Sequence, residues 1–306
     1  MKPRDVAGLL VLSLVWGSAF LFTDVVVEEV PPSTIVAGRM LLASTFLLTV
    51  ALAGRRGLPP RNTWALLLVL AAVNNVVPFS LITWAQQHIT SSLAATLNAT
   101  MPLFTVLIVV AATEERIDAE RLVGVAVGFA GAVVVIGPDF GDITGSNMLG
   151  DLAVIGASAC FAVGTVIARQ RLRGDPIVMA GGQMVWGALL AVPIALAVNG
   201  TPDMAVPAKV ALSWAFLGLV SSGVAYVVFF TLVQRMSATQ VSVVSYLIPL
   251  TATVLGWAVL DEPLGLNLFA GMALILAGLA AVNGGWSSLF RRGSAEERAG
   301  AGAPGG

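Results

Sequence analysis

The residues of this sequence that could do chemistry are polar side chains that stand alone within long apolar runs. Most are uncharged: Asn74, Asn75, Asn98, Ser222, Tyr226, Ser245 and Tyr246. A side chain at such a position must face a cavity or another helix, because hydrocarbon offers it no hydrogen-bond partner. Each one alone is explained by hydrogen bonding between helices. Together they predict a cavity for a zwitterionic, neutral or aromatic solute, with Asn74, Asn98, Tyr226 and Tyr246 as the leading contacts.

Two charged residues also fall within apolar runs. Arg39 lies about five residues into its run, roughly 7 Å below the surface that we expect to be the outer one. A charge at that depth is costly, so it is either paired or functional. Asp24, near the outer end of the preceding run, is the expected partner. An Arg39–Asp24 pair is explained equally well as a structural tie between two helices and as part of an outer gate.

Three further residues suit a cavity wall or a bending helix. Trp16 lies near the centre of its run, too deep for the aromatic belt at the membrane surface. An aromatic wall suits an apolar or amphipathic solute, although packing is the commoner role of such a ring. Pro102 and Pro249 each remove a backbone hydrogen bond and are expected to bend their helices. We interpret both prolines as candidate hinges.

Groups required for catalysis, metal binding or ATP hydrolysis are missing from the sequence pattern. His88 is the only histidine and Cys160 the only cysteine, so one chain holds neither a zinc site nor a His-dependent triad. No G-x-x-x-x-G-K-[ST] motif is present, and no Asp or Glu lies near the middle of an apolar run, which disfavours a central proton relay. We therefore expect no catalytic residue, no metal and no cofactor, and coupling through Asp24 stays open. The alternatives to a solute carrier are an intramembrane enzyme and a non-transporting membrane scaffold.

The composition places these residues in a membrane. Hydrophobic residues make up 57% of the chain and charged residues only 11%, whereas a soluble domain carries roughly 25% charged residues. The net charge of −1 gives no field that would attract nucleic acid. Continuous apolar runs of about 20 residues predict helices that cross a lipid bilayer and exclude the alternating strands of a barrel. Ten such runs lie at 6–27, 34–53, 64–86, 91–112, 120–137, 149–170, 177–198, 210–233, 238–260 and 266–286.

The basic residues predict the orientation of these spans. With the N-terminus inside, the cytoplasmic segments hold all of the 16 lysines and arginines except Arg39 and Lys209. This asymmetry is typical of the positive-inside rule. We therefore expect a multi-pass protein of the cell (cytoplasmic) membrane with both termini in the cytoplasm. The first run leads into Glu28–Glu29 without a small-residue cleavage site, and we expect it to be retained.

The two halves of the sequence align at an offset of 147 residues. Each half holds five apolar runs, an odd number, so the second half must be inverted relative to the first. Inverted repeats place a solute site near the bilayer midplane, between the two halves. The matched pairs are Gln87 with Gln234, Pro102 with Pro249, Glu114–Glu115 with Asp261–Glu262, and Gly124, Gly131 and Gly137 with Gly271, Gly278 and Gly284.

Two of these matched features have structural interpretations. Glu115 and Glu262 are expected to cap the helix that follows each of them, because carboxylates favour helix N-termini. The glycines form small faces that allow helices to approach closely, within one chain or between the two copies of a homodimer.

The chain resembles the EamA-type family of the drug/metabolite transporter superfamily over about residues 5 to 286. The resemblance rests on Trp16–Gly17, on Arg39 followed by MLLAS, and on the two matched prolines, each leading to an acidic pair and a G-x₆-G helix. It implies an all-α fold of ten membrane helices, arranged as two inverted five-helix repeats around a central cavity, and export of small metabolites such as amino acids. We expect a first repeat at 1–139, a second at 148–290 and a disordered cytoplasmic tail at 291–306, working as a secondary carrier by alternating access.

Overall fold

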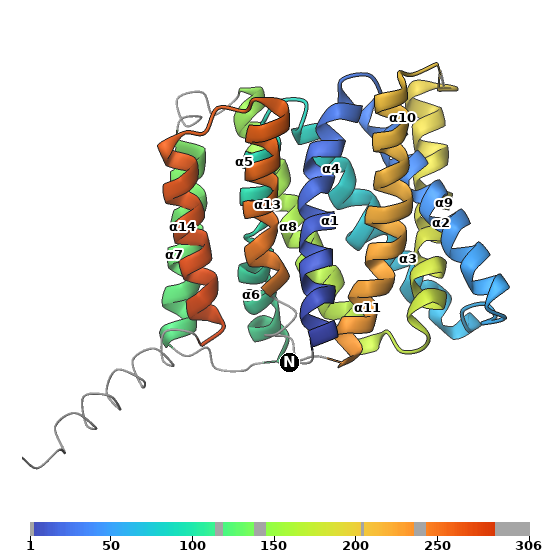
Figure 1. Cartoon of the computed structure of the whole chain (residues 1–306). Helices are drawn as coiled ribbons and strands as arrows, with labels where there is room; N and C mark the ends of the chain where they lie inside the picture. The colour runs from blue at the N-terminus through green and yellow to red at the C-terminus, as the bar shows by residue number, and fades with distance from the viewer. Residues whose placement is uncertain (1–2, 114–118, 138–144, 203–204, 236–242, 285–306) are drawn as a thin grey trace, which may run out of the picture.

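The computed structural model of the chain describes residues 3–113, 119–137, 145–202, 205–235 and 243–284. Within these ranges the chain forms helices joined by short connections, and no strand occurs there. The helices stand roughly parallel to one another, some in front of others, and α1 begins at the lower edge of the molecule in Figure 1. In chain order they are α1 (Pro3–Val27), α2 (Pro32–Ala53), η1 (Arg61–Thr63), α3 (Trp64–Ala71), η2 (Ala72–Val76), α4 (Val77–Ala85), α5 (Ser91–Asn98), α6 (Met101–Thr113), α7 (Ala119–Ile136), α8 (Ser146–Arg171), α9 (Pro176–Asn199), α10 (Ala208–Ala215), η4 (Phe216–Val224), α11 (Ala225–Arg235), α13 (Val243–Leu260) and α14 (Leu266–Val282).

The length and composition of these helices are those of a membrane protein. Eight continuous helical segments of the described residues are long and apolar enough to cross a bilayer, and α13 and α14 are shorter apolar helices. Large apolar side chains point outward, among them Leu212, which is 71% exposed. An outer surface of this kind is stable only against lipid. The prediction of an all-α polytopic membrane protein is confirmed.

The predicted runs coincide closely with the observed helices. Each of the ten runs is helical over most of its described residues, and turns replace the helix at Gln86, Ala99–Thr100 and Asn283–Gly284. The start of the run at 238–260, the end of the run at 266–286 and the tail at 291–306 lie outside the described residues, as do Glu114 and Glu115. Long apolar runs predict helices well, because only a helix satisfies all of its own backbone groups in lipid.

Two pairs of helices pack over most of their length, α7 with α14 and α2 with α9. The α7–α14 pair stands at one end of the molecule (Figure 1), and its contact is made by glycines. Gly124 faces Gly278 and Gly131 faces Gly271 so closely that a Cβ atom on any of them would touch the opposite backbone. These faces are therefore filled by a contact within one chain.

Two helical segments widen into π-helical turns, at η2 and η4. Each interrupts a span near its middle, between α3 and α4 and between α10 and α11. A π turn inserts one extra residue per turn and re-aims the side chains around it, and such turns are frequent at functional sites. Here they hold the polar pairs Asn74–Asn75 and Ser221–Ser222.

The two candidate hinge prolines behave differently. Pro102 stands in the first turn of α6, and the span is broken at Ala99–Thr100 between α5 and α6. Because Pro102 has no N–H, the carbonyl of Asn98 loses its helical donor, and the Ser158 hydroxyl lies 3.4 Å from that oxygen. Pro249 is buried inside the continuous helix α13. Only Pro102 coincides with a break in its span.

Glu262 corrects one expectation about capping. Its carboxylate does not cap α14, the helix that follows it. It accepts hydrogen bonds from the backbone N–H groups of Ser91, at 2.6 Å, and Ser92, at 3.1 Å, and a short one from the Ser92 hydroxyl. These groups begin α5, so Glu262 caps a helix from the other half of the chain. The connection after α13 lies against the start of α5. The first N–H groups of a helix have no acceptor within that helix, so they bind the carboxylate of Glu262.

Candidate functional site

A cavity of about 1350 Å³ runs through the middle of the molecule. Every membrane span contributes to its wall, from α1 at Trp16 to α14 at Val282. At one end the lining residues are exposed and include Arg121, Arg169 and Arg173. At the other end Thr23 and Gln86 line it and are themselves buried. The cavity is therefore open at the end of the molecule where the N-terminus lies and closed at the opposite end.

Aromatic rings form much of the wall. Trp16 of α1 packs against Tyr226, with ring centroids 6.0 Å apart, and against Phe229, at 5.4 Å. On the other side, Phe79 of α4 meets Phe161 of α8 edge to face at 5.8 Å. All five rings line the cavity. Surfaces of this type bind apolar or aromatic bodies, with a few polar groups to fix their orientation.

A buried hydrogen-bonded network lies behind this wall. The Tyr226 hydroxyl accepts a hydrogen bond from the Asn75 amide at 2.8 Å and donates to the carbonyl of Asn74 at 3.3 Å. Gln183 of α9 donates a short hydrogen bond to the Asn75 side-chain oxygen. The network holds η2 against α9 and α11. Both polar groups of the Asn75 side chain are hydrogen-bonded within the protein.

The Asn74 side chain differs from that of its neighbour. It lines the cavity and makes no hydrogen bond to another described residue. Gly164 of α8 lies opposite, and a Cβ atom there would come within 2.7 Å of the Asn74 Cβ. The glycine makes room for the carboxamide, which is left available to a bound solute or to water.

Arg39 projects from α2 into the cavity wall and is 7% exposed. Its Nε donates to the Ser222 hydroxyl at 2.5 Å and its Nη2 to the Ser221 hydroxyl at 3.0 Å. Its guanidinium carbon lies 3.8 Å from the centre of the Phe79 ring. The expected ion pair with Asp24 is not formed: the salt bridges between described residues leave both side chains out. The hydroxyls of η4 and the ring of α4 draw the guanidinium away from the outer end of α1, where Asp24 stands.

The structure divides the residues that the sequence singled out into two sets. Those that line the cavity are Trp16, Arg39, Asn74, Asn98, Pro102, Tyr226 and Ser245. Asn75 and Ser222 are fully buried behind the wall, and Tyr246 accepts a hydrogen bond from the Asn283 amide at 3.2 Å without lining the cavity. Asp24 and Pro249 also lie away from it. Adjacent residues of a helix point in directions about 100° apart, which separates Asn74 from Asn75.

Sequence reasoning missed several residues of the site. Gln183 is a lone amide in an apolar run, the same signal that selected Asn74, and it could have been chosen. Phe79 and Phe161 carried no such signal, because an apolar ring that lines a cavity resembles one that faces lipid. Metal ligands give no competing site: the described residues contain no group of three or more His, Cys, Asp or Glu side chains able to hold an ion.

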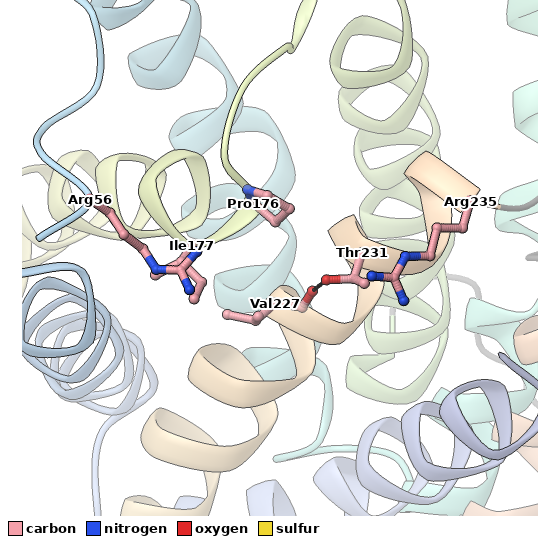
Figure 2. A pocket seen from close by; sticks show the side chains of 6 residues that line it. All are labelled: Arg56, Pro176, Ile177, Val227, Thr231 and Arg235. Atoms are coloured by element: carbon pink, nitrogen blue, oxygen red, sulfur yellow. Dashed lines mark hydrogen bonds between the residues drawn. The ribbon is translucent and has the colours of Figure 1, made fainter. Parts of the chain in front are cut away.

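A second, smaller pocket of about 300 Å³ lies beside the open end of the cavity, and Pro176 lines both. Figure 2 shows the side chains of Arg56 and Arg235 on opposite sides of it, with Pro176, Ile177, Val227 and Thr231 between them. Arg56 pairs with Asp175 at 2.6 Å. Burial opposes ionisation of Asp175, but hydrogen bonds from Arg56 and from the first N–H groups of α9 outweigh it and lower the pKa of this carboxyl. Asp175 therefore stays ionised as the N-cap of α9.

Comparison with known proteins identifies the kind of molecule that has this cavity. The sequence model of the EamA-like transporter family matches the chain twice, over residues 5–137 and 148–284. The uncharacterized transporter YoaV of Bacillus subtilis is 22% identical over 274 residues, which cover 89% of this chain and 94% of the relative. The uncharacterized inner membrane transporter YedA of Escherichia coli K12 is 29% identical over 265 residues, covering 84% and 83%.

A solved crystal structure of a protein shares the fold. It superposes with a TM-score of 0.67 and 21% sequence identity, and the match covers 92% of this chain and 96% of that one. The relatives are named as transporters and not as enzymes, which agrees with the lack of catalytic groups in the apolar runs. With its membrane-length helices and both halves matched by one family model, this chain belongs to the EamA-like transporter family.

Proposed function

We propose that this membrane transporter is a secondary carrier that exports small metabolites such as amino acids from the cytoplasm by alternating access. The observation that supports this most strongly is the central cavity, which has a polar and aromatic wall and is closed at one end. A carrier needs a solute site that opens to one side at a time, near the bilayer midplane. A non-transporting scaffold does not require a cavity of this size with the Asn74 carboxamide in its wall.

Two inverted repeats, at 1–139 and 148–290, would supply the moving parts. The family model matches both halves, and helix pairs that contact each other extensively are counterparts at the offset of 147 residues: α2 with α9, and α7 with α14. The π turns η2 and η4 also fall at corresponding positions. Reciprocal contacts of this kind are those expected around a pseudo-two-fold axis in the membrane plane, and rocking about that axis would exchange the open and closed ends.

The arginines support the orientation that this proposal assigns to the protein. Arg56, Arg169, Arg173 and Arg235 all lie at the end where the cavity opens, and the positive-inside rule assigns such an end to the cytoplasm. The termini would then be cytoplasmic, and the structure would be the inward-open state of a carrier in the cell membrane. A solute would enter from the cytoplasm and leave when the outer end, at Thr23 and Gln86, opens.

Counterflow in liposomes tests this function. Purified protein, reconstituted into vesicles preloaded with one solute, is given a trace of the same labelled solute outside, across a panel of amino acids and related metabolites. We expect saturable accumulation of at least one solute class. Asn74→Ala should lower its rate about fivefold, because losing a polar contact to the solute costs on the order of 1 kcal/mol.

Tyr246→Phe is the matched control for that experiment. It deletes one hydroxyl from another polar side chain of a span, but that hydroxyl bonds Asn283 and Tyr246 does not line the cavity. Its counterflow rate should equal that of the unaltered protein. If Tyr246→Phe lost activity while Asn74→Ala kept it, the solute path would not be this cavity. Absence of counterflow for every solute, from folded protein, would contradict the carrier function itself.

A further inference from the structure

The charge distribution of the cavity is one-sided. The lining residues include Arg39, Arg121, Arg169 and Arg173, and no Asp or Glu is among the described residues of the wall. Among the described residues of the wall, a solute therefore meets arginine side chains and no carboxylate. Arginines at the mouth of a cavity with low-dielectric walls raise the local concentration of anions.

Arg39 is the deepest of these charges, and no counter-ion for it occurs among the described residues. Its two hydrogen bonds go to neutral hydroxyls, those of Ser221 and Ser222. The described residues supply no acceptor for Nη1 and no carboxylate within 4.0 Å of the guanidinium. Taking a charge out of water without a partner is costly, and intramembrane arginines are retained where they bind something.

The geometry around Arg39 leaves one direction open. Phe79 covers a face of the guanidinium and the serines hold one edge of it. The remaining N–H groups, which include those of Nη1, have no acceptor among the described residues, and Arg39 lines the cavity. A planar guanidinium with a free edge matches a carboxylate, which accepts two parallel hydrogen bonds from it.

From these observations we infer that Arg39 is the anchor for the carboxylate of the transported solute. The solute class is a small organic acid with an apolar or aromatic body, which packs against the rings of Trp16, Phe79 and Phe161. The inference requires no cationic amino group on the solute, because the described residues of the wall include no carboxylate to receive one. This inference rests on the proposed function, which it makes more specific.

Binding of related probes to the purified protein measures how much the carboxylate contributes to affinity, apart from the rest of the solute. Three probes share one body and differ in charge: 3-phenylpropionate, 3-phenylpropionamide and 3-phenylpropylamine. Calorimetric titration should give the carboxylate an affinity at least about tenfold above that of the amide and the amine, as expected for a charge-assisted hydrogen bond. Equal affinities, or a preference for the amine, would overturn the inference without any substitution in the protein.

Substitutions then locate the anchor. Arg39→Met should abolish the preference for 3-phenylpropionate, and Arg39→Lys, which keeps the charge but not the planar fork, should retain part of it. Arg171→Met is the matched control, because Arg171 is exposed and lies outside the cavity wall. A preference that survives in folded Arg39→Met would show that another group binds the carboxylate.

Counterflow of the same probes tests the proposed carrier function separately from the proposed anion site at Arg39. Selective binding of the carboxylate without counterflow of any solute would support the anion site and contradict the carrier. Counterflow that is as fast for amines and amides as for acids, and unchanged in Arg39→Met, would support the carrier and overturn the anion site.

Discussion

The variant Gly131→Ala will unfold far more readily than the unaltered protein. A Cβ atom at position 131 would stand 2.7 Å from the Gly271 carbonyl oxygen and from the backbone nitrogen of Ile275. Both obstacles are backbone of α14, so no side-chain rotation relieves them and the two helices must separate. Overpacking of this kind costs about 3 kcal/mol. Thermal unfolding in detergent, followed by circular dichroism, measures the loss.

Gly156→Ala is the control for this substitution. It is also a glycine within a membrane helix, but the nearest atom to its added Cβ is a side-chain carbon of Leu81 at 3.8 Å, an ordinary contact. Alanine is the better helix former by about 1 kcal/mol, so this variant should be as stable as the unaltered protein or slightly more so. Equal stability of Gly131→Ala and Gly156→Ala would contradict the close α7–α14 contact.

The second large effect is expected at Glu262. Replacement by alanine leaves the buried N–H groups of Ser91 and Ser92 and the Ser92 hydroxyl without their acceptor. An orphaned buried donor costs about 1–3 kcal/mol, so losing all three bonds should lower the free energy of unfolding by about 3 kcal/mol or more. Chemical unfolding in mixed detergent reports this free energy.

Two further substitutions separate capping from charge. Glu262→Gln keeps one acceptor oxygen and should lose less stability than Glu262→Ala. Asp261→Asn removes an adjacent, exposed carboxylate and retains a residue type that tolerates the positive φ of 53° at this position. It should be neutral. A loss in Asp261→Asn as large as in Glu262→Ala would mean that local charge, and not the cap on α5, stabilises this connection.

The helices and the polar cavity could be predicted from the sequence, because both depend on which residues lipid excludes. The apolar runs predicted the spans, and Asn74, Asn98 and Tyr226 were chosen because hydrocarbon cannot satisfy them. The direction of each side chain could not be predicted. A π turn changes the helical phase locally, so the sequence alone did not indicate that Asn75 points into the protein while Asn74 meets the cavity.

The partner of Arg39 was also beyond sequence reasoning. Charge complementarity favoured Asp24, the nearest acidic residue in a neighbouring span. The structure satisfies the guanidinium with two serine hydroxyls and a phenylalanine ring, which come from the second half of the chain and from α4. Contacts between residues more than 180 positions apart depend on how the halves pack, and local pattern does not report that.

Cysteine labelling tests alternating access through the cavity most directly. Cys160 is the only native cysteine, so in a Cys160→Ser background a single introduced cysteine is the only thiol that a maleimide can label. Thr165→Cys probes the cavity wall on α8, toward its open end, and Thr23→Cys probes its closed end. Lys209→Cys, on an exposed position outside the cavity, calibrates labelling from the outer side. A membrane-impermeant maleimide is applied to right-side-out and to inside-out membrane vesicles, with and without the solute that counterflow identifies.

We expect the thiol at position 165 to react only from the cytoplasmic side and the thiol at position 23 to be protected in the absence of solute. Addition of the solute should slow the first reaction and make position 23 reactive from the outer side. Reactivity of both positions from both sides at once, or rates that the transported solute leaves unchanged, would contradict alternating access through this cavity.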